Sequence, residues 1–249
     1  MLINKKMRMA DLIHQNYEVL TVIRRFDIEL GFADKTIEEV CSNYKINTDF
    51  FVEIVNSFNN ETYFSEKILK QYEVRDILFY LKSTHQYYLS KQIPDIEARI
   101  KELEFSDNNK KNKALIENFF NEYKEEFIKH VQREEERIYP YIIELDRALK
   151  TRKAKQIFNH SINEYSIFEY QQEHEDVEAK LYDLKNIIIK YLPSPLNPEG
   201  YNAILVKLFK LENDLNEHSR IEEKVIIPKV KEMEKEYHNA VASNKMEIV

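Results

Sequence analysis

The sequence has very little of what ends helices and builds tight turns. Its 249 residues include 2 Gly, 6 Pro and no Trp. A protein rich in strands needs many turns, and glycine and proline supply much of the turn chemistry, so this scarcity argues for long helices. The single cysteine, Cys41, excludes a framework of intrachain disulfides. The fold class that follows is all-α.

The sequence also lacks long apolar runs and an excess of positive charge, which limits where the protein is expected and what it is expected to bind. No apolar run is long enough to span a bilayer. The first residues, MLINKKMRMADLIHQ, carry positive charge without an apolar core, so a signal peptide is not predicted and a cytoplasmic protein is expected. With 37 basic against 44 acidic residues the net charge is −7, which disfavours nucleic acid and anionic membrane as partners.

One eleven-residue pattern occurs twice in the chain. HVQREEERIYP starts at His130 and HSRIEEKVIIP starts at His218, and both read His-x3-Glu-Glu-x4-Pro. Residues four apart lie on the same face of a helix, so His130 pairs with Glu134 and His218 with Glu222. An imidazole and a carboxylate side by side on each of two helices can hold metal in the core of a bundle.

The repeat includes two more histidines. His85 lies 45 residues before His130, and His174 lies 44 residues before His218. Residues from about 70 to 235 therefore read as two copies of a helix–loop–helix unit, which together predict a four-helix bundle with inward-facing ligands. Six ligands indicate two metals rather than one. The predicted ligands are His85, His130, Glu134, His174, His218 and Glu222.

Other interpretations of these residues compete with a metal site. A lone histidine on an apolar helix face is usually a hydrogen-bonded core residue, but four at equivalent positions, two of them with matched glutamates, favour metal. HEDVE at 174–178 resembles the start of a zinc-protease HExxH motif, but the second histidine is absent. Glu126 and Glu173 are candidates for a second shell of hydrogen bonds around the ligands, with solvated helix residues as the alternative.

The ligand types narrow the choice of metal. Carboxylates with imidazoles suit iron, with manganese as the other option. The predicted ligands include no thiolate, which is the ligand that would favour a structural zinc site. If Glu134 and Glu222 each bridge two iron ions, each ion receives two carboxylate oxygens and two imidazoles. An oxo or hydroxo bridge would add a fifth ligand. One octahedral position would then stay open for a small ligand such as O2, NO or peroxide.

The first 60 residues predict a separate unit of three short helices. MADLIHQNYEVLTVIRRF has the apolar spacing of one helix, and Gly31 marks a break after it. Thr36 followed by Glu39 forms a capping-box pattern that starts a second helix, and Thr48 or Asp49 is expected to cap the third. The polar stretch NSFNNET predicts the boundary, which gives a small domain over 1–60 and a bundle over 63–240.

These residues carry a family resemblance over about 70–235. The order of the six ligands, the EE-x4-P after each paired His, QEHEDVEAKL around His174 and PLNPEGYNAILVKLFKLENDL before His218 resemble hemerythrin-like di-iron proteins of the RIC (repair of iron centres) family. The resemblance implies a non-haem di-iron centre and a role in nitrosative or oxidative stress, with iron–sulfur proteins as clients for cluster repair.

The amino-terminal residues also look like the small first domain of that family, with one departure. Where the family has an adjacent pair of cysteines, this chain reads IELGF at 28–32, and Cys41 falls in the following helix. The leading hypothesis is a di-iron stress protein acting in cluster repair. The alternative is a sensor or reversible binder of O2 or NO that signals through the amino-terminal domain. A third option is a helical interaction module. Whether the chain is an enzyme stays open, as does its oligomeric state, with a homodimer as one option.

Overall fold

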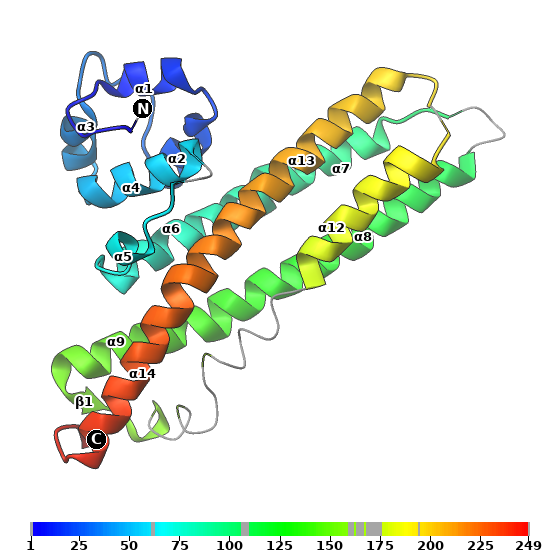
Figure 1. Cartoon of the computed structure of the whole chain (residues 1–249). Helices are drawn as coiled ribbons and strands as arrows, with labels where there is room; N and C mark the ends of the chain where they lie inside the picture. Colours follow the sequence, from blue (N-terminus) through cyan, green and yellow to red (C-terminus); the bar gives the residue numbers. More distant parts are fainter. Residues whose placement is uncertain are drawn as a thin grey trace. The chain divides into compact units, whose positions relative to one another are not determined.

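The computed structural model describes residues 2–60, 63–105, 110–158, 162, 167, 176–193 and 195–248. Within these ranges nearly all regular structure is helical, which confirms the expected all-α class (Figure 1). The chain divides into two compact units, Met1–Thr84 with Lys224–Ile226, and His85–Glu223 with Ile227–Val249. Across the described ranges, no helix has the length and apolar character needed to cross a membrane.

The first unit is a set of short helices. Its helices are α1 Met9–Gln15, α2 Val19–Arg25, α3 Ile37–Asn43, α4 Thr48–Asn59, α5 Glu66–Leu69 and most of α6 Val74–Tyr87. The single helix predicted over MADLIHQNYEVLTVIRRF is wrong, because α1 and α2 are separate. Asn16 is extended, with φ −149° and ψ 103°, and its side chain accepts a hydrogen bond from the Glu18 amide at 2.9 Å. Such local bonds compete with helix continuation.

The helix starts in this unit follow from identifiable caps. The capping box at Thr36 and Glu39 is confirmed, with the Thr36 hydroxyl accepting from the Glu39 amide at 3.3 Å. Helix α4 is capped one residue earlier than expected, by Asn47, whose side chain accepts from the Phe50 amide at 3.1 Å. Gly31 lies where a break was predicted, and its φ of 105° is a conformation that side-chain-bearing residues rarely adopt.

The second unit contains a four-helix bundle. Its helical segments are η1 Tyr88–Gln92, α7 Ile93–Lys101, α8 Lys110–Arg133, η3 Glu134–Ile138, α9 Tyr139–Thr151, α12 Asp176–Asn186, η4 Ile187–Tyr191, α13 Pro198–Ile221, the first two residues of η5 Glu222–Ile226, and α14 Ile227–Ala242. Helix α7 packs against α8 and α13, and α12 packs against the same two helices, which closes the bundle. Beyond it α9 packs against α14, and the short strands β1 Lys153–Ala154 and β2 Glu247–Ile248 pair in parallel.

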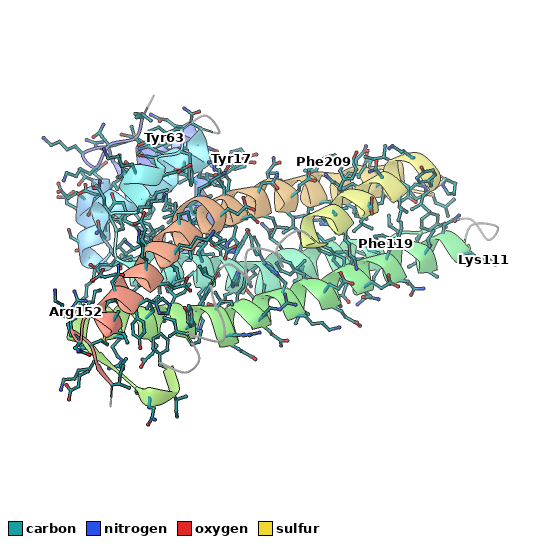
Figure 2. All side chains as sticks on the ribbon, turned by 60° about the horizontal axis from the view of Figure 1, so that its bottom comes forward. Tyr17, Tyr63, Lys111, Phe119, Arg152 and Phe209 are labelled. Atoms are coloured by element: carbon teal, nitrogen blue, oxygen red, sulfur yellow. The ribbon has the colours of Figure 1, made fainter. Side chains whose placement is uncertain are left out.

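The bundle core is built from the apolar faces of its helices. Tyr123 and Phe127 of α8 are buried, as are the leucines at 208 and 211 of α13. Phe119 lies only partly buried at the edge of this core, and Phe120 beside it takes the interior position. Figure 2 shows Lys111 and Arg152 at opposite ends of the continuous run of α8, η3 and α9, which crosses the whole unit.

Four of the helical segments just named are single π turns, and each precedes a proline. In these turns a backbone N–H bonds to the carbonyl five residues earlier, as from Tyr139 to Glu134 and from Ile227 to Glu222. The prolines follow two residues after the turns, at positions 94, 140, 193 and 228. A proline inside an α-helix lacks a donor and crowds the preceding turn. After η1, η3 and η5 the widened turn relieves that crowding and the helix continues, whereas after η4 the helix ends, with Leu192 extended.

The π turns that precede Pro140 and Pro228 lie within the repeated motif. Each begins at the motif's own glutamate, Glu134 or Glu222, and the helix continues beyond it as α9 or α14.

Candidate metal centre

Four buried side chains from separate stretches of the second unit converge at one point. His85 lies in the last turn of α6 and His218 in the last turn of α13, while Glu134 opens η3 and Glu222 opens η5. One nitrogen or oxygen atom from each lies within 4.8 Å of those of the other three. All four residues were predicted as metal ligands, and the last turns of α6 and α13 together with the starts of η3 and η5 bring them to one place.

The donor atoms face one another directly. The Nε2 atoms of His85 and His218 are 3.0 Å apart. His85 Nε2 is also 3.1 Å from Glu134 Oε2, and His218 Nε2 is 3.3 Å from Glu222 Oε1. Two imidazole nitrogens and two carboxylate oxygens that point at a common centre form a donor set for a cation.

His130 joins this group through Glu134. Its Nε2 lies 3.1 Å from Glu134 Oε1, the oxygen that does not contact His85. The His130 side chain is 15% exposed, whereas that of Glu134 is 1% exposed, so His130 lies on the outer side of the cluster. Glu134 thus divides its two oxygens between two imidazoles, which is the arrangement a carboxylate needs in order to bridge two cations.

The remaining predicted site residues fall elsewhere. His174 and Glu173 lie outside the described residues. Glu126 pairs with the Nζ of Lys180 on α12. The three histidines that do not belong to the repeat were not predicted as ligands: His14 and His238 are exposed, and His160 lies outside the described residues.

Two residues that touch the cluster were missed by the sequence argument. Glu135 Oε1 lies 3.2 Å from His85 Nδ1, the placement by which a carboxylate orients a metal-binding imidazole. The Tyr139 hydroxyl donates to Glu222 Oε1 at 3.1 Å, and its ring stacks on His85 with centroids 5.7 Å apart. The second glutamate of each EE pair was a visible signal for Glu135. Tyr139 had none, because its position depends on the π turn.

The electrostatics of the cluster show how much charge it concentrates. Burial alone lowers the pKa of His85, but hydrogen bonds with Glu134 and Glu135 outweigh burial and raise the pKa to about 9. Burial, followed by the charges of Glu222 and Glu134, raises the pKa of Tyr139 well above its ordinary value. The buried carboxylates of Glu134 and Glu222 therefore favour the protonated, positively charged form of His85. A bound metal ion would supply that positive charge in place of the proton.

The donor set fits a metal with nitrogen and oxygen ligands. Burying a carboxylate without a counter-charge costs several kcal/mol, and both Glu134 and Glu222 are about 1% exposed or less. The one thiol is in the other unit, where burial raises the pKa of Cys41 to about 12 and keeps it protonated at neutral pH. The residues present can therefore hold a cation, and they do so without sulfur.

Comparison with known proteins agrees with this geometry. The family described as "Hemerythrin HHE cation binding domain" matches residues 85–230, more than half of the chain. A curated relative, the "Iron-sulfur cluster repair protein ScdA" of Staphylococcus haemolyticus (strain JCSC1435), is 17% identical over 210 residues, which cover 84% of this chain and 90% of the relative. The resemblance to hemerythrin-like proteins of iron-centre repair is confirmed. The chain belongs to the hemerythrin HHE cation-binding domain family.

Proposed function

We propose that this protein is a non-haem di-iron protein of the response to nitrosative or oxidative stress, and that it takes part in the repair of iron–sulfur clusters. The observation that carries the proposal is the buried convergence of His85, His218, Glu134 and Glu222, with atoms of all four within 4.8 Å of one another.

The proposed ligands are those expected from the repeat, including His130 and His174. Glu134 supports a pair of ions rather than one, because its two oxygens lie 3.1 Å from imidazoles of two different helices. Iron is proposed before manganese. Zinc is not favoured, because the proposed ligands are imidazoles and carboxylates and include no thiolate. When bound, iron would supply redox chemistry and a coordination position for NO, O2 or peroxide.

The role in repair is supported by the name of the curated relative, itself an iron–sulfur cluster repair protein. Within this chain the chemistry would proceed through iron donation or electron transfer. A thiol route is disfavoured, because Cys41 is fully buried and burial raises its pKa to about 12. Only a thiolate is an effective nucleophile or metal ligand.

The same observation favours a second candidate function, a reversible binder of NO or O2 that acts as a sensor. Such a protein needs no thiol and no transfer to a client. The two functions differ in their outcome: repair changes the cluster content of a second protein, whereas sensing changes only this protein.

Two measurements on one preparation test these proposals. Iron content and optical spectra are recorded with and without NO, and an NO-damaged [4Fe–4S] hydro-lyase is then incubated with the loaded protein. About two irons per chain, as expected for a bundle with this ligand count, together with recovery of the hydro-lyase would support repair. NO binding without recovery would favour the sensor.

Variants make the test specific to the cluster. Glu134→Ala removes a proposed bridge and should abolish both iron binding and recovery of the client. Glu144→Ala is the matched control, because Glu144 lies ten residues further along the same helical run and pairs with Arg147. Absence of iron from the wild-type protein after anaerobic loading would refute the di-iron proposal.

A further inference from the structure

Tyr139 is a polar side chain buried against the candidate metal centre. It is 4% exposed, its hydroxyl donates to Glu222 Oε1 at 3.1 Å, and its ring lies parallel to that of His85 within 7°. A single side chain on α9 thus contacts two proposed ligands that belong to other helices, η5 and α6.

The π turn is what brings this side chain to the site. Tyr139 follows His130 by nine residues, and at about 100° per residue an unbroken α-helix would place it about 180° away, on the opposite face. The turn that starts at Glu134 contains one additional residue. That residue rotates everything beyond it by about 100°, which brings Tyr139 round towards the cluster.

The two copies of the motif differ at this position. His130 is followed by Tyr139, whereas His218 is followed at the same spacing by Ile227, which is buried but has no polar group. The difference makes the two proposed bridging glutamates unequal. Glu134 lies between the imidazoles of His85 and His130. In contrast, Oε1 of Glu222 contacts His218 and also accepts the hydrogen bond from the Tyr139 hydroxyl.

We propose that Tyr139 is a positioning residue of the metal centre, which fixes the carboxylate of Glu222 through its hydroxyl and the imidazole of His85 through its ring. The inference rests on the proposed metal site and extends it to a residue outside the six ligands. The hydroxyl hydrogen bond reduces the rotational freedom of the Glu222 carboxylate before metal arrives. Loss of an outer partner of this kind typically weakens metal binding about 10- to 100-fold.

The chain offers a closely matched control two residues away. Tyr141 lies on the same helix, and its hydroxyl donates to a different glutamate, Glu234 of α14, at 2.6 Å. Tyr139→Phe and Tyr141→Phe therefore each delete one phenol–carboxylate hydrogen bond between α9 and the η5–α14 run. Only the first deletes a bond to a proposed ligand.

The test measures Fe(II) affinity under anaerobic conditions by competition with a chromogenic chelator, together with the optical spectrum after oxidation. Tyr139→Phe should weaken Fe(II) binding about tenfold or more and shift the spectrum, while Tyr141→Phe should match the wild type in both. Equal affinity and an unchanged spectrum in Tyr139→Phe would overturn the inference while leaving the proposed function standing. A wild-type protein that binds no Fe(II) would overturn both.

A second variant covers the case in which Tyr139→Phe does not fold. Site-specific replacement of Tyr139 by 3-fluorotyrosine keeps the ring and the hydroxyl but makes the phenol a stronger hydrogen-bond donor. Its iron spectrum should shift in the direction opposite to that of the phenylalanine variant, or away from the wild type if no phenylalanine variant is obtained. A spectrum identical to that of the wild type would count against a hydroxyl bond to Glu222.

Discussion

Removal of the metal should reverse the way in which stability depends on pH. In the metal-free protein the pKa of His85 is raised from its ordinary value of 6.5 to about 9, because its hydrogen bonds with Glu134 and Glu135 outweigh burial. The unfolded chain loses these partners. Protonated His85 therefore stabilises the fold fully below about pH 6.5, and this contribution is lost as the pH rises through about 9.

The size of the effect follows from the shift. Each pKa unit corresponds to about 1.4 kcal/mol, so a displacement from 6.5 to about 9 amounts to roughly 3 kcal/mol between pH 6 and pH 9. The metal-loaded protein should respond in the opposite direction, because metal binds neutral imidazole and displaces the proton. Its stability should rise over the same interval as protons compete less with the metal.

Urea unfolding at pH 6, 7.5 and 9, with and without a chelator, would check both slopes. His238→Gln serves as a control, since His238 is an exposed histidine outside the cluster and should leave the slopes unchanged. Measurements stay at or below pH 9, because burial raises the pKa of Cys41 to about 12 and that thiol would add a loss of stability above pH 9. A chelated protein whose stability is flat or rises between pH 6.5 and 9 would show that the reasoning about His85 is wrong.

Four further outcomes are expected. Glu134→Ala should lose both metals together, measured as iron per chain, and retention of one metal would contradict a bridging role. Glu135→Ala should lower iron affinity about tenfold while Glu135→Gln, which keeps an acceptor for His85 Nδ1, should recover most of it in the same chelator competition. Cys41→Ala should leave the NO-induced optical change unaltered, because the thiol is buried, and a lost response would revive a thiol mechanism. A chain beginning at Tyr63 should still bind iron, since the proposed ligands all lie beyond it. If the truncated chain folds but loses its metal, His14 or Cys41 would have to be considered as a metal ligand.

The sequence was most informative where one signal repeats. The spacing of His130 and Glu134, doubled at His218, identified side chains that converge in the structure, because side chains four residues apart share a helix face whatever the rest of the fold does. The capping box at Thr36 was equally local and equally readable. Both depend on contacts within one or two turns.

Features that depend on longer range were not readable. The break at Asn16 depends on a side-chain bond to Glu18 that competes with a good apolar stripe. Tyr139 was invisible because the α-helical period assigns it to the wrong face, and only the π turn corrects the assignment. Glu135 contacts a histidine 50 positions away, a pairing that requires the bundle itself.

The π turn in η3 makes residue count, rather than residue identity, the critical property of this segment. Glu136 is exposed within the turn, so its substitution should be tolerated. Its deletion would restore the α-helical phase and rotate α9 by about 100° about its axis. Tyr139 and the buried side chains at 142 and 145 would all turn out of place at once. The η3 segment should therefore tolerate substitution of its exposed residues but not a change in the number of its residues.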